Sequence, residues 1–194
     1  MLKIAITGSI GSGKSYVCGL LRQRGINIYD CDTAAKRIIT NNIDVRFQLT
    51  KLVGKDVYIG KNLNKAILAD YILASKSNAE QVNRIVHPVV ATDFLSSGCQ
   101  WMECAILYTS GFNKLVDKAI CVTAPLDLRI NRIVQRDHVS SARAKEWIYC
   151  QMSQSDILKN SDFEIINDGK HEIENQIDYI LNQINIIGNN KFNS

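Results

Sequence analysis

A short glycine-rich run with a lysine and a serine is the feature of this sequence most directly tied to chemistry. Residues Gly8 to Ser15 match the pattern G-x-x-x-x-G-K-S in full. Glycines let backbone N–H groups approach phosphates closely, and the N-terminus of a following helix adds partial positive charge. Lys14 can bridge the outer phosphates, and the Ser15 hydroxyl can take a position on Mg²⁺. The run therefore predicts a site for a nucleoside triphosphate with Mg²⁺, rather than a glycine-rich turn that binds nothing.

Two carboxylates, Asp30 and Asp32, follow the second apolar run of the chain. In an extended segment, residues two apart face the same side, so both could point into one cleft. A carboxylate there could take the proton of an acceptor hydroxyl. Asp32 is equally suited to cap a helix that begins near Ala34. The residues alone leave both roles open for Asp32.

Three arginines, Arg129, Arg132 and Arg136, are spaced to lie on one face of a helix. Such a face beside a helical hairpin is typical of a mobile lid that covers a triphosphate and excludes water. The alternative is a solvated surface with Asp127 and Asp137 as partners. The nearby phosphate-binding motif favours phosphate binding.

His87 and Pro88 lie inside a segment with helical periodicity. A proline there predicts a kink or a restart of the helix. A lone histidine more often packs or caps than binds a ligand. The kink could equally shape a groove for an acceptor.

The elements that must position these residues alternate between strands and helices. Apolar runs predict buried strands at 2–7, 26–29, 101–107, 118–123 and 163–166, and helices are expected from 12 to 25, at 126–136, from 140 onward and at 170–187. Residues 33–98 are expected to be helical at 34–40, 44–53, 65–73 and 78–95, without a comparable strand and with solvated turns at 41–42 and 61–64. The pattern predicts an α/β fold with three layers and a five-stranded, mostly parallel sheet, interrupted by a helical insertion.

The composition excludes several classes of protein. With 46% hydrophobic and 22% charged residues, the 194-residue chain is neither collagen-like nor disordered. No apolar run approaches the roughly 18 residues of a membrane helix, and the N-terminus shows no signal-peptide core. A net charge of +4 is too small to indicate nucleic-acid binding, and six scattered cysteines suit a reducing compartment. We expect a cytoplasmic protein with neither a nucleic-acid nor a membrane partner.

Several further motifs follow the glycine-rich run in a fixed order. Thr7 begins the opening T-G-S-I-G-S-G-K-S, and the others are D-C-D at 30–32, I-V-H-P-V-V at 85–90, R-I-V-Q-R-D-H-V-S at 132–140, Q-M at 151–152 and I-I-N-D-G at 165–169. Together they resemble the dephospho-coenzyme A kinase family over nearly the whole chain, from Ile6 to about Gln176. The first motif alone is generic, but the ordered set is specific.

This resemblance implies a P-loop NTPase fold. Residues 1–32 and 99–188 would form the nucleotide-binding core, 33–98 a helical insertion that binds the acceptor, 136–155 a helical lid and 189–194 a frayed tail. The implied reaction is phosphorylation of the ribose 3′-hydroxyl of 3′-dephospho-coenzyme A by ATP with Mg²⁺, which gives coenzyme A and ADP. This is the last step of coenzyme A biosynthesis. We expect a monomer or a weak homo-oligomer.

The resemblance also implies roles for individual residues. Asp32 becomes the best candidate base, with Asp30 supporting it or the metal. Lys14 and Arg136 would stabilise the transferring phosphoryl group, and Arg132 would assist. The ATP site would comprise Gly11, Ser12, Gly13, Lys14, Ser15, Tyr16, Arg132, Arg136, Asn167 and Gly169, with Mg²⁺ at Ser15, and the acceptor site would comprise Thr7, Asp30, Asp32 and His87.

Four positions depart from the family pattern, namely Ser9 for a glycine, Tyr16 for a small residue, Ala69 for an arginine and Thr109 for a glutamate. The nearest alternative function is another P-loop nucleotide or nucleoside kinase. A GTP-dependent switch would need N-K-x-D, and 113–116 fail at the fourth position. An adaptor that binds ATP without turnover is compatible with the motif, although Lys14, Ser15 and Asp32 are all present.

Overall fold

The computed structural model describes residues 2–191, and the chain divides into two compact units. The first comprises residues 1–28 and 99–194, and the second comprises residues 29–98. The first boundary falls after Ile28, four residues before the boundary expected from the sequence, and the second falls after Gly98. Each unit is described separately below.

A five-stranded sheet forms the centre of the first unit. Its strands are β1 (Ile4–Thr7), β2 (Ile28–Asp30), β5 (Trp101–Glu103), β6 (Lys118–Thr123) and β7 (Phe163–Ile166), in the order β2-β5-β1-β6-β7. The last two residues of β2 already belong to the second unit. β1 pairs in parallel with β5 and β6, and β6 pairs in parallel with β7. The α/β fold with a mostly parallel five-stranded sheet is therefore confirmed.

One strand is shorter than the sequence predicted. β5 ends at Glu103 instead of continuing to Leu107. The N–H of Cys104 still donates to Ile6 O, but the chain then folds into turns in which the N–H of Ser110 donates to Ile106 O at 2.8 Å. The apolar residues at 104–107 are thus compatible with a buried turn as well as with a strand.

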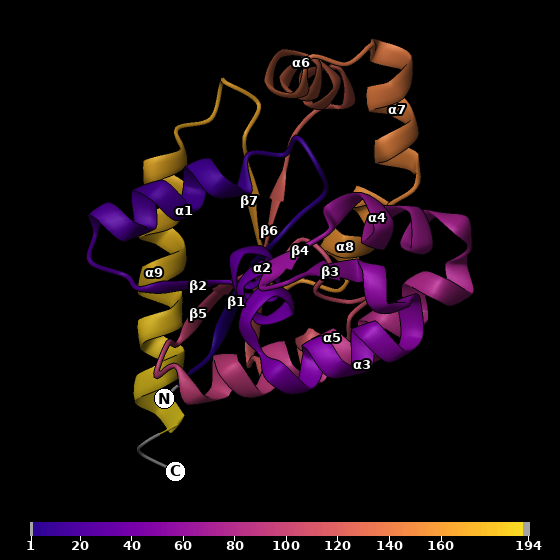
Figure 1. Cartoon of the computed structure of the whole chain (residues 1–194). Coiled ribbons are helices and arrows are strands. Elements are labelled where there is room, and N and C mark those ends of the chain that lie inside the picture. Colours follow the sequence, from indigo (N-terminus) through magenta and orange to yellow (C-terminus); the bar gives the residue numbers. More distant parts are fainter. Residues whose placement is uncertain (1, 192–194) are drawn as a thin grey trace. The chain divides into compact units, whose positions relative to one another are not determined.

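Helices cover both faces of this sheet. α1 (Lys14–Gln23) and α9 (Ile173–Lys191) lie on one side of the strands, whereas α8 (Gln154–Lys159) lies on the other (Figure 1). Alternate strand residues such as Ile4, Ile6 and Ile120 pack against Val17 and Ile177 in one buried cluster. Burial of each such side chain contributes about 1.5–3 kcal/mol before the entropic cost of folding. This packing fixes the central strand and the helix after it.

Two further helices follow β6. α6 (Leu126–Asp137) begins after Pro125 as predicted, and α7 (Ser141–Tyr149) is capped by Ser140, whose hydroxyl accepts from the N–H of Arg143. α6 and α7 share a small apolar cluster that includes Ile133 and Ile148. A short 3₁₀ helix, η2 (Phe112–Leu115), lies between β5 and β6.

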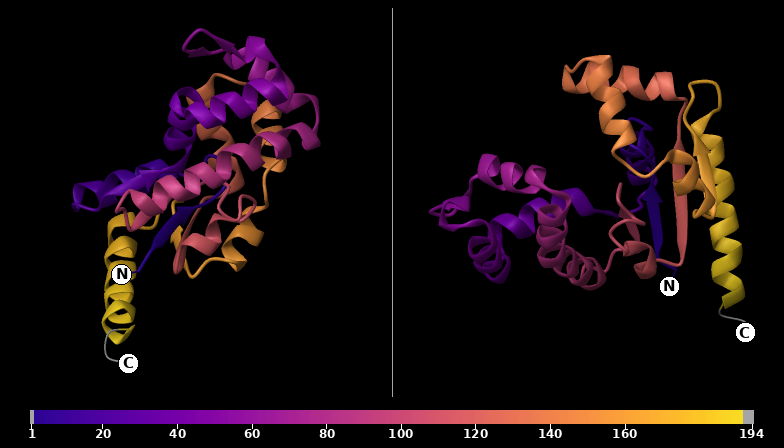
Figure 2. Two further views of the ribbon diagram at one scale, coloured as in Figure 1. Left: turned by 60° about the horizontal axis from the view of Figure 1, so that its bottom comes forward. Right: turned by 90° about the vertical axis from the view of Figure 1, so that its right-hand side faces the viewer.

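The second unit is mainly helical. It contains α2 (Cys31–Asn41), α3 (Ile43–Val53), η1 (Lys55–Val57), β3 (Tyr58–Ile59), β4 (Asn62–Leu63), α4 (Lys65–Ala74) and α5 (Lys76–Ser96) (Figure 2). α5 continues through Pro88, where the sequence predicted a kink or a restart. Buried Val82, Val86 and Val90 stabilise both sides of that position.

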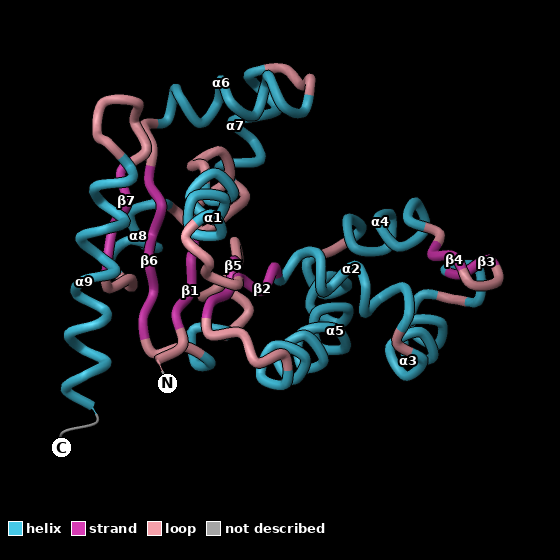
Figure 3. The backbone as a smooth tube through the Cα atoms, turned by 90° about the vertical axis from the view of Figure 1, so that its left-hand side faces the viewer, coloured by secondary structure: helices cyan, strands magenta, loops and turns pink. Residues whose placement is uncertain are grey.

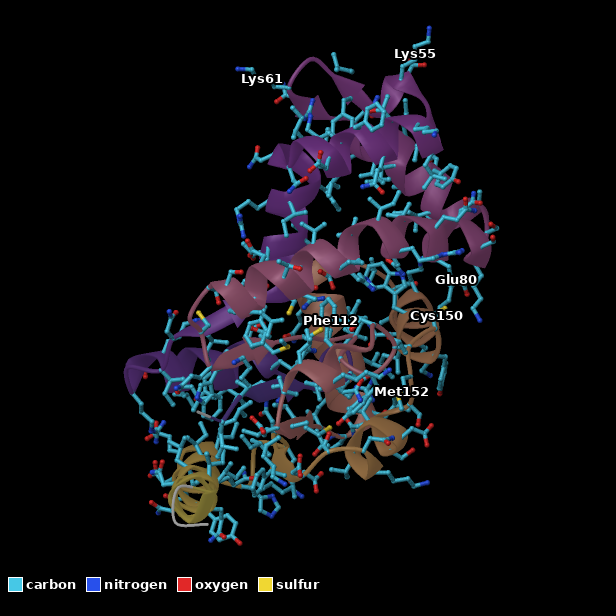
Figure 4. The ribbon with its side chains drawn as sticks, turned by 90° about the horizontal axis from the view of Figure 1, so that it is seen from below. Lys55, Lys61, Glu80, Phe112, Cys150 and Met152 are labelled. Atoms are coloured by element: carbon cyan, nitrogen blue, oxygen red, sulfur yellow. The ribbon has the colours of Figure 1, made fainter. Side chains whose placement is uncertain are left out.

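A two-stranded antiparallel hairpin, β3–β4, was not predicted from the sequence (Figure 3). It replaces part of the solvated turn expected at 61–64. Arg46 holds it, because its guanidinium donates to the carbonyls of Gly60 and Lys61 and lies 4.1 Å from the centre of the Tyr58 ring. The side chain of Lys61 projects outward at the tip of this unit (Figure 4). Strands of two residues carry too little periodicity to be recognised in a sequence.

The C-terminal helix differs from the expectation at both ends. Asp168 Oδ1 accepts from the N–H groups of Lys170 and His171, which makes a turn and delays the helix to Ile173. α9 then continues through Gly188 to Lys191, so 189–191 are helical rather than a frayed tail. Residues 192–194 of the expected tail lie outside the described residues. None of the described helices combines the length and apolarity needed to span a bilayer.

Candidate active site

The glycine-rich run forms a tight loop between β1 and α1. Gly11 and Gly13 have φ angles of 79° and 95°, which favour glycine. A Cβ on Gly11 would lie 2.7 Å from the carbonyl oxygen of Arg129, and a Cβ on Gly13 would collide with the Asn167 amide. Within the described residues, the N–H groups of Gly11, Gly13 and Ser15 donate no hydrogen bond. The loop can therefore offer several N–H donors to an anion at a helix N-terminus.

Lys14 folds back across this loop. Its Nζ donates to Gly8 O at 2.9 Å and to Ser9 O at 3.3 Å. These carbonyls hold the ammonium group beside the N–H donors. The positive charge that a phosphate needs is thus positioned by the loop itself.

Ser15 pairs with an acidic residue that the sequence analysis did not single out. Its Oγ donates to Glu103 Oε1 at 3.0 Å, and Glu103 is the last residue of β5, the strand beside β1. Burial raises the pKa of the Cys18 thiol, and the Glu103 carboxylate raises it further. Sequence reasoning missed Glu103 because the strand was expected to continue past it. An acidic residue within an otherwise apolar run was the available signal.

The hydroxyl and carboxylate oxygens of Ser15 and Glu103 are a donor set that suits Mg²⁺. They lie next to the loop that would hold phosphates. Because Mg²⁺ usually has only one or two protein ligands, it needs phosphate oxygens close by as further ligands. Among residues 2–191, no group of three or more histidine, cysteine, aspartate or glutamate side chains could enclose a metal ion. The residues present fit an ion that a nucleotide would share.

Arg132 and Asn167 hold the second half of the loop. The Arg132 guanidinium donates to the carbonyls of Gly11 and Ser12, and also to Asn167 O and Oδ1 at 3.1 and 3.0 Å. Asn167 is 8% exposed, and its Nδ2 donates to Ser12 O at 2.9 Å. The structure thus brings together four of the residues predicted for the ATP site.

The three arginines of α6 have different surroundings. Arg129 is only 4% exposed, and its Nη2 donates to Ser9 Oγ at 2.6 Å, so this residue is not part of a solvated face. The side chain of Arg136 is 63% exposed and pairs with Asp137 at 2.7 Å. Helical spacing placed the three arginines on one face of α6, but it did not indicate that Arg129 would be buried against the loop.

Three other residues predicted for the ATP and acceptor sites differ in their exposure. Tyr16 is 59% exposed in the first turn of α1, and Gly169 is exposed in the turn before α9. Thr7, expected to contact the acceptor, is fully buried, and its hydroxyl has no hydrogen-bond partner among the described residues. The Ser12 hydroxyl is also buried and unpartnered.

The two aspartates of the second unit have separate roles. Asp30 is the N-cap of α2, because its Oδ1 accepts from the N–H of Thr33 and its Oδ2 from the Thr33 hydroxyl, both at 2.9 Å. Of the two roles left open for Asp32, that of helix cap is therefore excluded. Since α2 already begins at Cys31, the extended geometry that would align the two carboxylates is also absent. Asp32 is exposed in the first turn of α2, and its carboxylate makes no hydrogen bond to the described residues.

The start of α2 is fixed to α5 by a polar contact. Asp93 Oδ2 accepts from the Tyr29 hydroxyl and from Arg37 Nη2, each at 2.6 Å. Tyr29 directly precedes the capping residue, so this contact also fixes the turn that carries Asp32. His87 lies half-buried on α5, where burial lowers the pKa of its imidazole.

A pocket of about 270 Å³ lies elsewhere in the first unit. It is lined by Ala105, Ile106, Tyr108, Thr109, Cys150, Gln151, Met152 and Ile157. Cys150 and Met152 flank Gln151 after α7 (Figure 4). Thr109, one of the departures from the family pattern, is part of this lining.

The parallel sheet and the phosphate-binding loop after its central strand define the class of P-loop nucleotide-binding proteins. The family model described as dephospho-CoA kinase matches residues 2–172. The chain belongs to the dephospho-CoA kinase family, which confirms the membership inferred from its motifs and makes it a kinase.

Individual relatives agree with this result. A dephospho-CoA kinase of Bacteroides fragilis is 41% identical over 187 residues, covering 91% of this chain and 89% of the relative. A crystal structure of a Thermus thermophilus protein has a TM-score of 0.82 and 25% identity, covering 94% of this chain and 97% of that protein. The dephospho-CoA kinase of Campylobacter jejuni, at 21% identity, shares the fold with a TM-score of 0.65 over 97% of this chain and 98% of that enzyme.

Proposed function

We propose that this protein transfers the terminal phosphoryl group of ATP to the ribose 3′-hydroxyl of 3′-dephospho-coenzyme A. In this reaction the 3′-oxygen forms a bond to phosphorus, the bond to the ADP oxygen breaks, and the hydroxyl proton passes to a base. The products are coenzyme A and ADP. The family match over residues 2–172, together with the complete loop, is the observation that supports this proposal most strongly.

The loop and its neighbours would bind ATP. The N–H groups of Gly11, Gly13 and Ser15 would donate to phosphate oxygens, and Ser12 would belong to the same cradle. Lys14 would exchange its contacts with Gly8 O and Ser9 O for contacts with the outer phosphates. There its positive charge would stabilise the negative charge that develops in the transition state. Tyr16, Asn167 and Gly169 would border the nucleotide, with Asn167 acting partly through the loop that it already contacts.

Ser15 and Glu103 would hold Mg²⁺. The ion would supply positive charge to the phosphate oxygens when bound. The Ser15 hydroxyl would be a direct ligand, and the Glu103 carboxylate would orient that hydroxyl through their hydrogen bond of 3.0 Å. Such a partner affects metal affinity without having to touch the metal.

Asp32 would be the general base. It lies on the first turn of a helix that Asp30 caps, so its backbone position is fixed while its carboxylate stays free to accept a proton. Asp30 would support it through this cap, and His87 would contribute to the acceptor site. A carboxylate whose oxygens already accept hydrogen bonds within the protein would be less able to accept the proton.

Arg136 would stabilise the transferring phosphoryl group from the end of α6. Its ion pair with Asp137 is exposed, and such a pair is worth at most about 1 kcal/mol. A phosphate could therefore replace Asp137 at little cost. Residues 136–155 would form the lid, and Arg132 would act through its contacts with the loop and Asn167.

A coupled assay of ADP release tests the proposal. Purified protein would be given ATP, Mg²⁺ and, in separate reactions, dephospho-coenzyme A, a nucleoside and a nucleoside monophosphate. We expect turnover with dephospho-coenzyme A alone. Turnover with the nucleoside or the monophosphate but not with dephospho-coenzyme A would establish the alternative function instead.

A further inference from the structure

We propose that Arg129 and Gln151 are positioning residues that hold Ser9 and Ile10 in the conformation that binds ATP. This inference deepens the proposed function, since it takes ATP as the ligand of the loop. The two residues come from different parts of the chain, Arg129 from α6 and Gln151 from the segment after α7. Both contact the first half of the loop, where no residue was assigned a role above.

Arg129 is held almost out of solvent by the loop. Its Nε donates to Ile10 O at 3.0 Å, and its Nη2 donates to Ser9 Oγ at 2.6 Å. Burial lowers the pKa of its guanidinium, so the charge depends on these acceptors for compensation. A buried charged donor without an acceptor is costly, which makes the Arg129 contacts specific for one loop conformation.

Gln151 fixes the same two residues from another direction. Its Oε1 accepts from the Ile10 N–H at 2.9 Å and from Ser9 Oγ at 3.4 Å. The Ile10 N–H is thereby withdrawn from any anion, whereas those of Gly11, Gly13 and Ser15 remain available. Gln151 thus selects which donors the loop presents.

Ser9 links the two holding residues. Its hydroxyl accepts a hydrogen bond from Arg129 and donates one to Gln151. The three side chains therefore form one continuous hydrogen-bonded network. A residue without a hydroxyl at this position would leave Arg129 Nη2 without its acceptor. The side chain of Ile10 also packs against the apolar cluster of α6 and α7, which includes Ile133 and Ile148.

The second half of the loop is held in a parallel way. Arg132, three residues after Arg129 on the same helix, donates to the carbonyls of Gly11 and Ser12. On one face of α6, Arg129 therefore holds the first half of the loop and Arg132 holds the second half. The loop conformation depends on α6 as much as on its own glycines.

Calorimetric titration with MgATP tests this inference without an acceptor. The informative variants are Arg129→Met, Ser9→Ala, Gln151→Leu and the double variant Ser9→Ala with Arg129→Met. Arg24→Met is the matched control, because Arg24 follows α1 at the end away from the loop and pairs with Asp178 and Glu174 of α9. Thermal melting without nucleotide shows which variants are folded, and if Arg129→Met is unfolded, Ser9→Ala and Gln151→Leu decide.

We expect ATP affinity to fall about tenfold in Arg129→Met and about three- to tenfold in Ser9→Ala and Gln151→Leu. The loss in the double variant should be smaller than the sum of the two single losses, because both changes remove the same hydrogen bond between Arg129 and Ser9. In turnover, the KM for ATP should rise while the KM for the acceptor and kcat at saturating ATP stay within about twofold. The control should bind like the wild type.

Wild-type-like ATP affinity in all folded loop variants, or additive losses in the double variant, would overturn the positioning role. A wild-type protein that binds MgATP but does not phosphorylate dephospho-coenzyme A would contradict the proposed acceptor alone. The two failures are therefore distinguishable.

Discussion

The hydroxyl of Ser15 donates a hydrogen bond of 3.0 Å to Glu103, 88 residues further along the chain. The contact exists because β5 pairs in parallel with β1, so Glu103 ends its strand beside the start of the loop. A serine of the glycine-rich loop and a carboxylate are thereby joined at the carboxyl edge of the sheet, where α/β proteins bind their ligands.

Replacing the Glu103 carboxylate should weaken the binding of Mg²⁺ rather than the binding of ATP itself. In Glu103→Gln, we expect the Mg²⁺ concentration for half-maximal rate to rise by about 10-fold or more, as for other residues that orient a metal ligand. Titration of the rate with Mg²⁺ at fixed ATP measures this. Glu174→Gln is the control, since Glu174 is an exposed carboxylate on α9. An unchanged Mg²⁺ dependence in Glu103→Gln would leave Glu103 with a structural role only.

The base assignment predicts a loss of turnover without a loss of nucleotide affinity. Asp32→Asn should lower kcat by about 10²–10⁴-fold, because an amide cannot accept the hydroxyl proton. Asp44→Asn is a matched control, since Asp44 occupies the corresponding second position of α3 and is also exposed. Steady-state rates and ATP titrations of both variants make the comparison. If Asp32→Asn retains near wild-type kcat, Asp32 is not the base.

Lys14 should contribute mainly to the transition state. In Lys14→Ala, we expect at least about 3 kcal/mol of transition-state stabilisation to be lost, the scale of one electrostatic donor. The ratio of kcat/KM between wild type and variant gives this value. Lys51→Ala, an exposed lysine of α3, should leave the ratio unchanged. A far smaller loss in Lys14→Ala would mean that the ammonium contacts the loop but not the reacting phosphate.

His87 should make folding sensitive to acid. Burial lowers the pKa of its imidazole in the folded protein, so below about pH 6.5 the unfolded chain binds the proton more readily. The contribution of this residue to stability is therefore present above that pH and is lost as the pH falls toward the folded pKa. Denaturant unfolding of wild type and His87→Gln at about pH 7.5 and about pH 5.5 measures it, and the wild type should lose more stability between them. Equal losses would show that His87 titrates normally.

Local patterns predicted most of the framework, because strands such as β6 and β7 are mainly apolar and the loop has a fixed spacing. The caps, burial and side-chain contacts that depend on how separate elements begin and pack were not predictable. Whether Asp30 or Asp32 caps α2 depends on where the helix begins, a difference of two residues. The burial of Arg129 requires the loop to pack against α6, and the role of Glu103 requires the pairing of β5 with β1. The hairpin β3–β4 depends on tertiary contacts from Arg46.

Identification of the reaction product tests the central claim most directly. Wild-type protein would be incubated with ATP, Mg²⁺ and dephospho-coenzyme A, and the product would be analysed by mass spectrometry and ³¹P NMR. We expect a gain of one phosphoryl group as a monoester at the ribose 3′-position, with one ADP formed for each product molecule and far less product from Asp32→Asn in the same time. Release of ADP without phosphorylated acceptor, or a phosphoryl group at another position, would contradict this claim.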